Sequence, residues 1–367
     1  MQEINVIDLK EKKVLGRCGT ISGELPIFWN GGGIEVNVKA AELSADIYAE
    51  YETREIWCAY LINGAFMGRF MLSNGLNHIC LFRGMNPEAV KNVKILRETQ
   101  PIGDDPKMYM AIRTLYTDGT FETVKEGNIK IEFVGDSLTT GEGTYGAKEE
   151  KDWLPMFMSC SRQYAYMVAD MLNADVNIVS QSGWGVHCAY DNNIYNVLPR
   201  VYEQKCGPIN SAKAIDAGAH EKYDFTFNPD VIVINLGTND QGSFDNPAFT
   251  DPATGITYKM KKNEDGSFNE EDVKIFTDAV TDFLKMVRKN NPDAYILWLY
   301  GMCGAPLEVP ICTGIKAFAS ETGDKRVDYM QLPAFTEDSA GALNHPGLSS
   351  HMQAAMLIAA KIKSLNL

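Results

Sequence analysis

The chain has 367 residues, of which 45% are hydrophobic and 22% are charged, as in an ordinary folded protein. Its length exceeds the roughly 100 to 200 residues that usually share one core, which predicts two domains. The formal net charge of −14 argues against nucleic acid or an anionic membrane surface as a partner, because both attract faces rich in Lys and Arg. A neutral substrate fits this charge better.

Three features of the sequence bear on the cellular compartment. Residues 1–8 show no basic stretch followed by an apolar core, so we expect no secretory signal. No segment approaches the roughly 18 to 20 apolar residues that span a bilayer, so we expect no membrane association. The eight cysteines form no C-x-x-C pair, and we interpret them as reduced, mostly buried thiols that bind no metal. Together these features predict a cytoplasmic protein.

Residues 33–121 alternate between apolar and polar side chains and are interrupted by turns, as in 33–39 and 45–51. A period of two predicts strands with one buried face, and several such strands in succession predict a β-sandwich. Asn63-Gly64 predicts a hairpin, because a two-residue type I′ turn requires φ > 0 at both positions. Asp118-Gly119 predicts a second hairpin.

After about residue 127 the pattern changes to short β-branched runs separated by helical stretches. This alternation predicts an α/β unit, in which helices cover a parallel sheet. The expected strands lie near 129–134, 176–180, 230–236, 294–300 and 326–331, and the expected helices near 161–173, 270–290 and 348–364. In the second helix, Val273, Phe276 and Val280 recur at helical spacing, and Asn291-Pro292 ends it.

Four short motifs follow or adjoin these predicted elements. They are Gly135-Asp136-Ser137, Ser180-Gln181-Ser182-Gly183, Gly237-Thr238-Asn239-Asp240 and Asn344-His345-Pro346. Three of them stand where predicted strands end, and open α/β sheets bind ligands at that edge. A serine hydroxyl becomes a nucleophile when a base within about 3 Å removes its proton. We therefore expect His345 to lie beside Ser137, with the long segment 242–272 as a loop near this site.

The four motifs resemble the four blocks of the SGNH (GDSL-type) hydrolase superfamily, which is named for its serine, glycine, asparagine and histidine. The resemblance implies a flavodoxin-like catalytic domain in which Ser137 is the nucleophile and His345 the base. It also implies an oxyanion hole made by the backbone N–H groups of Ser137 and Gly183 and by the Asn239 amide. Gly185 is an alternative to Gly183, and His187 is an alternative to His345.

The last motif departs from the pattern of the superfamily. Most members have an aspartate two or three residues before the histidine, whereas this chain has Leu343 and Ala342 at those positions. Either a backbone carbonyl holds the His345 Nδ1–H, which gives a Ser-His dyad, or a nearby acid such as Asp338 or Glu337 does so. The carbonyl is favoured because it orients the ring without burying a charge.

An amino-terminal β-sandwich followed by an SGNH domain resembles the second family of carbohydrate esterases, over nearly the whole chain. The resemblance implies a jelly-roll-like sandwich over residues 1–126 and a catalytic domain over 127–367. It also implies an esterase that removes acetyl groups from acetylated xylan or mannan oligosaccharides without a metal or organic cofactor. Such enzymes often have Trp before the catalytic histidine, where this chain has Asn344.

Aromatic residues near the first two motifs are candidates for a sugar platform, because sugar rings pack on flat aromatic faces. These candidates are Trp184, Tyr190, Tyr145 and Trp153. The function predicted is thus a serine esterase acting on acetylated carbohydrate. The alternatives are an SGNH hydrolase of lipids or thioesters and a catalytically weak carbohydrate-binding protein. The sequence makes no prediction of oligomeric state.

Overall fold

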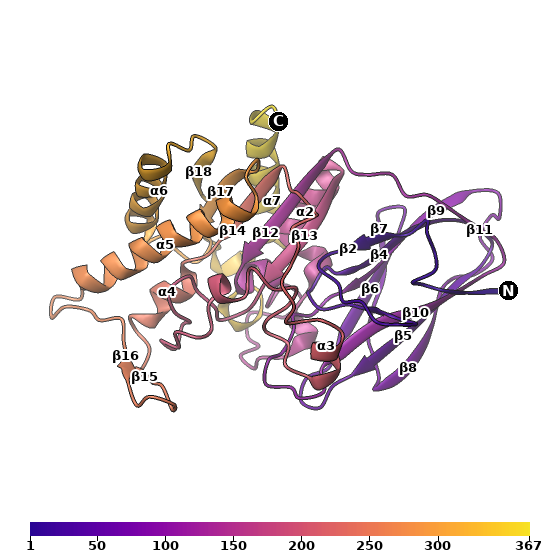
Figure 1. Ribbon diagram of the computed structural model, residues 1–367, viewed down its shortest axis with the longest axis horizontal. Coiled ribbons are helices and arrows are strands. Elements are labelled where there is room, and N and C mark those ends of the chain that lie inside the picture. The colour runs from indigo at the N-terminus through magenta and orange to yellow at the C-terminus, as the bar shows by residue number, and fades with distance from the viewer.

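The computed structural model describes residues 1–367 and has an all-β part and an α/β part that lie side by side (Figure 1). The all-β part contains the first eleven strands. These are β1 (Gln2–Asn5), β2 (Lys13–Leu15), β3 (Leu25–Pro26), β4 (Gly33–Lys39), β5 (Leu43–Glu50), β6 (Trp57–Ile62), β7 (Ala65–Met71), β8 (Gly75–Phe82), β9 (Val90–Arg97), β10 (Tyr109–Thr117) and β11 (Thr120–Glu122). They form two antiparallel sheets, one in the order β1-β10-β5-β8 with β3 beside β10, the other β11-β4-β9-β6-β7 with β2 beside β4.

The alternating pattern of the sequence explains how these sheets pack. On β4, Ile34, Val36 and Val38 are buried, whereas the residues between them are partly exposed. The buried side chains of β4 share one apolar cluster with Ile47 of β5 and Ile112 of β10, which belong to the other sheet. The two sheets therefore form a sandwich around this core, as the period of two predicts.

The two predicted hairpins have different outcomes. Asn63 and Gly64 both have positive φ, 50° and 78°, and join the paired strands β6 and β7, as predicted. The prediction at Asp118-Gly119 is wrong, because β10 and β11 belong to different sheets. There the chain crosses between sheets so close to β4 that a Cβ on Gly119 would lie 1.9 Å from the Lys39 carbonyl oxygen. The dipeptide predicts a turn but does not determine which strand the following residues pair with, and β11 pairs with β4.

The α/β part is built on a five-stranded parallel sheet. Its strands are β12 (Ile129–Gly135), β13 (Ala174–Ser180), β14 (Val231–Asn235), β17 (Tyr295–Tyr300) and β18 (Val327–Gln331). All five predicted strands are present, and their spatial order, β13-β12-β14-β17-β18, is the doubly wound order 2-1-3-4-5. The order reverses between β12 and β14, which places a ligand-binding crevice at the carboxyl ends of these two strands.

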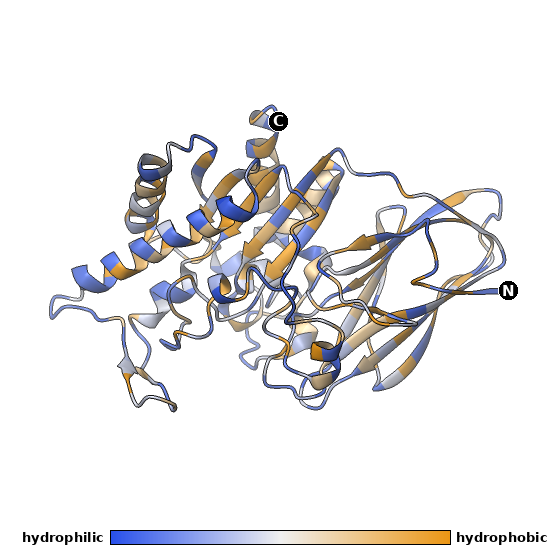
Figure 2. Ribbon diagram, in the orientation of Figure 1, coloured by the Kyte–Doolittle hydropathy of each residue, from blue (hydrophilic) through white to orange (hydrophobic).

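Seven α-helices and five 3₁₀ turns complete the fold. The helices are α1 (Ser137–Thr140), α2 (Tyr164–Leu172), α3 (Ala212–Asp216), α4 (Thr238–Ser243), α5 (Glu270–Asn290), α6 (Glu308–Thr322) and α7 (Leu348–Ser364). The 3₁₀ turns are η1 (Pro155–Phe157), η2 (Cys160–Arg162), η3 (Leu198–Arg200), η4 (Glu337–Ser339) and η5 (Ala342–Asn344). In Figure 2, the strands of the parallel sheet are largely hydrophobic and α5 is hydrophilic over much of its surface. None of these helices has both the length and the apolar character needed to cross a membrane.

The three predicted helices are present, and α6 is a further helix that was not predicted. Pro310 and Gly314 interrupt its helical pattern, yet neither breaks it. Pro310 lies in the first turn, where a missing N–H costs no helical bond. Gly314 packs directly on α5, where a Cβ would lie 2.8 Å from the Thr277 carbonyl oxygen. The close approach of two helices, which no local pattern encodes, explains this glycine.

The segment 242–272 contains a small hairpin of β15 (Phe249–Thr250) and β16 (Thr257–Tyr258). Figure 1 shows this hairpin at the lower left, extending away from the body of the protein. Of the whole segment, only Gly242 lines the large cavity at the carboxyl edge of the parallel sheet. The segment therefore mostly projects outward, whereas we expected a loop beside the site.

The two parts share a buried polar contact. Arg17, between β2 and β3, forms a 3.0 Å ion pair with Glu132 of β12, and both side chains are almost fully buried. The guanidinium also lies 4.0 Å from the centre of the Tyr223 ring and donates to the Tyr202 carbonyl at 2.5 Å. Nη1 and Nη2 of the arginine thus bond to Tyr202, Gln204 and Glu132 of the α/β part, whereas Nε has no partner, so this one side chain joins the amino-terminal part to the α/β part.

Candidate active site

A cavity of about 1020 Å³ lies at the carboxyl edge of the parallel sheet. Its lining includes Ser137, Gly183, Asn239 and His345, so the fold brings all four sequence motifs to one place. Residues of the sandwich side, Arg54, Gln100, Ile102, Gly103 and Asp104, form part of the same lining. The cavity therefore lies between the two parts of the protein.

Ser137 follows β12 at the start of α1. The carboxylate of Asp136 caps this turn by accepting a hydrogen bond from the Leu138 N–H at 3.0 Å. The strand-to-helix turn is tight at Gly135, where a Cβ would lie 2.0 Å from Thr139 Oγ1. These constraints leave the Ser137 hydroxyl at the cavity wall with 5% of the residue exposed.

His345 contacts Ser137 directly. Its Nε2 lies 2.8 Å from the Ser137 Oγ, which is within hydrogen-bond distance. On the other side of the ring, Nδ1 lies 3.0 Å from the Leu343 carbonyl oxygen. With Nδ1–H donating to that carbonyl, Nε2 is the unprotonated nitrogen and accepts a hydrogen bond from the Ser137 hydroxyl.

The turn before His345 has an unusual backbone. Leu343 and Asn344 both adopt left-handed conformations, with φ of 59° and 56°, which a bulky residue such as leucine rarely does. The conformation is held by hydrogen bonds from the Leu343 N–H to the Glu150 carbonyl at 2.9 Å and from the His345 N–H to the Ala342 carbonyl at 3.0 Å. The turn places a carbonyl beside Nδ1, where the predicted alternatives would place a carboxylate.

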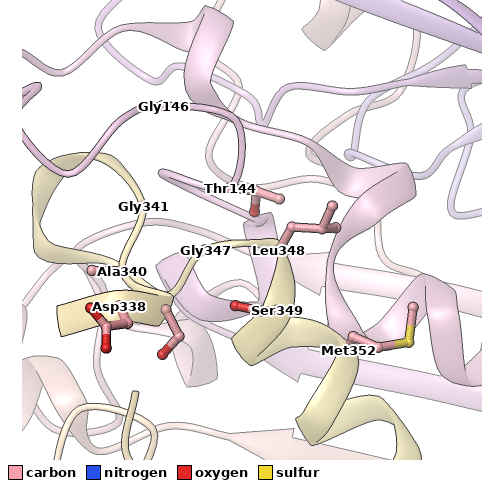
Figure 3. A pocket seen from close by; sticks show the side chains of 10 residues that line it. Thr144, Gly146, Asp338, Ala340, Gly341, Gly347, Leu348, Ser349 and Met352 are labelled. Atoms are coloured by element: carbon pink, nitrogen blue, oxygen red, sulfur yellow. The ribbon is translucent and has the colours of Figure 1, made fainter. Parts of the chain in front are cut away.

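Those alternative carboxylates lie elsewhere. Glu337 pairs with Lys148 at 2.9 Å on the surface. Asp338 lines a second, smaller cavity of about 480 Å³, shown in Figure 3 with Thr144, Leu348 and Met352 around it. Neither acid forms a hydrogen bond or ion pair with His345, so the carbonyl of Leu343 is the group that contacts Nδ1.

Ser137, Gly183 and Asn239 line the cavity and carry N–H groups with hydrogens that no acceptor in the protein uses. The backbone N–H groups of Ser137 and Gly183 donate to no acceptor in the protein. The Asn239 amide donates one hydrogen to the Trp184 carbonyl at 2.9 Å and has a second one for the cavity. Gly183 has a φ of 80°, and a Cβ there would lie 3.2 Å from the Tyr190 ring. Gly183 lines the cavity, whereas Gly185 does not.

The loop that carries Gly183 is anchored at two points. Asp240 is buried and accepts hydrogen bonds from the N–H groups of Val186, His187 and Cys188 at 2.8 to 3.2 Å. On the other side, the Ser182 N–H donates to the Gln100 side chain at 2.8 Å. Gln100 follows β9 of the sandwich, and it was not predicted because no local signal links it to Ser182.

The other histidines near the site have different surroundings. His187 does not line the cavity, and its backbone N–H is bound by Asp240. His351 is fully buried in α7, stacked against Tyr164 with ring centres 6.1 Å apart. Burial lowers the pKa of His351 to about 3, from an ordinary value of 6.5, so this ring is neutral in the folded protein.

The buried His351 predicts a loss of stability in acid. Below pH 6.5 the unfolded chain binds a proton at His351 that the folded protein does not, so unfolding becomes more favourable as the pH falls towards 3. We expect this group to lower the free energy of unfolding by about 2 kcal/mol between pH 6.5 and pH 5. In urea titrations at both pH values, the free energy of unfolding of His351→Gln should fall by about 2 kcal/mol less than that of the wild type. Equal losses would contradict this assignment.

Three of the four predicted aromatic residues line the cavity: Trp184, Tyr190 and Trp153. Tyr190 is 51% exposed, and the guanidinium of Arg54 lies 5.2 Å from the Trp153 ring. Tyr145 does not line the cavity, because its ring turns towards Arg69 of β7, 5.3 Å from the guanidinium. Three aromatic side chains thus line the cavity, and Tyr145 is not one of them.

Comparisons with known proteins place the chain among carbohydrate esterases. No model of a known protein family matches the chain. An acetyl xylan esterase from the rumen bacterium Butyrivibrio proteoclasticus has a structure that is similar with a TM-score of 0.97 and 43% identity, over 99% of this chain and 98% of that one. A family two carbohydrate esterase from Clostridium thermocellum, solved in complex with cellohexaose, has a TM-score of 0.76 and 22% identity, over 96% and 98% of the two chains.

A cellulase/esterase from Acetivibrio thermocellus is 25% identical over 348 residues, which are 92% of this chain. The chain spans 37% of the length of that relative.

A parallel sheet in the order 2-1-3-4-5, with serine, glycine, asparagine and histidine at its carboxyl edge, defines the SGNH class of proteins. Within this class, the chain belongs to the carbohydrate esterases, in the family of the acetyl xylan esterase, as the full-length similarity at 43% identity shows. Structures named as family two carbohydrate esterases share its fold.

Proposed function

We propose that this protein is a serine esterase that removes O-acetyl groups from carbohydrate. The observation that carries this proposal is the 2.8 Å contact between Ser137 Oγ and His345 Nε2 in a cavity that also holds unused N–H donors. Acyl transfer requires an activated hydroxyl and preorganised donors for an oxyanion. The hydroxyl beside an imidazole and the unused N–H groups, at the same edge of the sheet, support both requirements.

The proposed cycle uses these groups in order. His345 Nε2 takes the Ser137 proton while Oγ attacks the acetyl carbonyl carbon. The resulting oxyanion accepts hydrogen bonds from the N–H groups of Ser137 and Gly183 and from the Asn239 amide. The imidazolium then gives its proton to the departing sugar oxygen, which leaves an acetyl-enzyme. In the second half, His345 Nε2 takes a proton from a water molecule while the water oxygen attacks the acetyl carbon. The bond between that carbon and Ser137 Oγ then breaks, the imidazolium returns its proton to Oγ, and acetic acid leaves and ionises to acetate.

The composition of the cavity supports a sugar rather than a long acyl chain as the substrate. Six of the 24 residues that line it are hydrophobic, one is proline, and the rest are polar, charged or glycine. A lipid or fatty acyl thioester requires a mainly apolar channel, whereas sugars combine hydroxyl groups with C–H faces that pack on aromatic rings. The neighbours named as acetyl xylan esterase and as a complex with cellohexaose favour the same class of substrate.

We also propose that residues 1–126 form a jelly-roll-like domain and residues 127–367 the catalytic domain. The last strand of the sandwich ends at Glu122 and the first strand of the parallel sheet begins at Ile129, which supports a boundary between them. Because Arg54 and Gln100 line the cavity, the sandwich would form one wall of the active site.

Mass spectrometry of acetylated xylan and mannan oligosaccharides after incubation with the enzyme tests this proposal. We expect a loss of one acetyl group, 42 Da by elementary mass, per turnover, and a preference for p-nitrophenyl acetate over p-nitrophenyl octanoate. A clear preference for octanoate would favour a lipid or thioester hydrolase. Binding of the oligosaccharides without any loss of acetyl groups would favour a binding protein.

A further inference from the structure

Glu142 lies beside the proposed catalytic pair, and the cycle above gives it no role. Its backbone N–H donates to the Ser137 carbonyl at 3.1 Å, which places Glu142 one turn beyond the nucleophile. The residue is 6% exposed and lines the cavity, and its Oε1 lies 3.7 Å from His345 Nε2. Neither carboxylate oxygen accepts a hydrogen bond from the protein. The nearly buried acid therefore faces the reacting nitrogen without a structural partner.

A negative charge near His345 would stabilise the cation that this ring becomes in the proposed reaction. When Nε2 takes the serine proton, the ring, whose side chain is 21% exposed, becomes a cation at the wall of the cavity. In a serine triad, an aspartate on the Nδ1 side balances that cation. Here Nδ1 meets the neutral carbonyl of Leu343, and Glu142 is the only carboxylate within 4.0 Å of either ring nitrogen.

We propose that Glu142 supplies the negative charge that stabilises the His345 imidazolium, acting from the Nε2 side of the ring. At 3.7 Å the carboxylate is too distant to take the hydrogen bond from Nε2, so Ser137 remains the direct partner at 2.8 Å. Glu142 takes up no proton. The proton moves from Ser137 Oγ to Nε2 and then to the leaving sugar oxygen, while the carboxylate stays ionised throughout.

This inference rests on the proposed function and makes Glu142 a positioning residue, because it acts through His345. The attraction between two unit charges about 4 Å apart is large where water is excluded. Since Glu142 lines an open cavity and is partly screened, its effect should be smaller than the roughly 10⁴-fold effect of a triad aspartate. We expect Glu142→Gln to lower kcat by about 10- to 100-fold.

The test compares Glu142→Gln with the wild-type enzyme on p-nitrophenyl acetate and on an acetylated xylo-oligosaccharide. Both substrates pass through the same imidazolium, so kcat should fall by a similar factor for each, with KM changed by less than about twofold. Methylboronic acid forms a tetrahedral adduct with a serine next to an imidazolium. Its inhibition constant should rise by about the factor by which kcat falls.

Two further variants complete the experiment. Glu149→Gln removes the same charge from an exposed position of the neighbouring loop and should leave both substrates unaffected. Glu142→Ala should regain part of its lost activity when formate is added, which a purely structural role would not produce. This rescue also keeps the test valid if the glutamine variant folds poorly.

Three outcomes would overturn the inference. They are an unchanged kcat in folded Glu142→Gln, a change confined to KM for the oligosaccharide, and an absence of formate rescue in folded Glu142→Ala. A change confined to KM would mean that Glu142 holds sugar hydroxyl groups instead. If the wild-type enzyme itself hydrolyses neither ester, the proposed function fails, and that result is distinct from all three.

Discussion

Replacing Ser137 by alanine is expected to lower kcat for acetyl ester hydrolysis by about 10⁴- to 10⁶-fold. The substitution removes the atom that forms the acetyl-enzyme, and no other hydroxyl makes a hydrogen bond with His345 Nε2. Steady-state rates with p-nitrophenyl acetate measure the loss. Because the Ser137 Oγ bonds only to His345 among protein groups, the thermal unfolding midpoint should change little.

A matched control for this prediction is Ser349→Ala. Ser349 is exposed and lines the smaller cavity of Figure 3, away from the proposed nucleophile, and its loss should leave the rates unchanged. Ser137→Ala should still bind an acetylated oligosaccharide with close to the wild-type affinity, as measured by calorimetry. Substantial turnover by Ser137→Ala would show that a different group is the nucleophile.

Asn239→Ala is expected to lower kcat by about 100- to 1,000-fold, with little change in KM. The amide is worth most when the carbonyl oxygen becomes an oxyanion, so its loss should affect the transition state more than substrate binding. The expected factor is the same for p-nitrophenyl acetate and for an acetylated oligosaccharide, because both present the same acetyl carbonyl. Steady-state kinetics on the two substrates measure it.

Asn239 also bonds to the Trp184 carbonyl at 2.9 Å, so part of the effect could arise from movement of Trp184. The two causes give different results. A displaced Trp184 would raise KM for the oligosaccharide and leave p-nitrophenyl acetate almost unaffected. A fall in kcat of less than about fivefold with both substrates would remove Asn239 from the proposed oxyanion hole.

Much of the α/β part could be predicted because its local patterns are strong. Buried parallel strands are continuous apolar runs, as in Val231–Asn235, and an amphipathic helix such as α5 repeats its apolar residues at helical spacing. The strand order could not be derived from these patterns. Ser137 and Asn239 nevertheless follow predicted strands, β12 and β14. Because such sheets bind ligands at their carboxyl edge, the sequence predicted a site near these two residues.

The residues that were missed share a physical cause. Gln100 comes from the all-β part and Ser182 from the α/β part, and Glu142 lies near His345 although some two hundred residues of sequence separate them. Neither contact leaves a periodic or local trace. The left-handed conformation of Leu343 was also not predictable, because residue propensities assign that conformation to glycine or asparagine. Contacts fixed only by tertiary packing explain each of these cases.

The hydrogen bond from the Ser182 N–H to Gln100 has a consequence for how such enzymes can be rebuilt. A binding module attached by a flexible linker can be exchanged freely, since the reaction takes place elsewhere. In this protein the sandwich braces the loop next to Gly183, so the amino-terminal part helps to shape the reaction centre itself. Replacing the sandwich with a different carbohydrate-binding module would remove this hydrogen bond, so we expect the rate of ester hydrolysis to fall as well as the affinity for sugars.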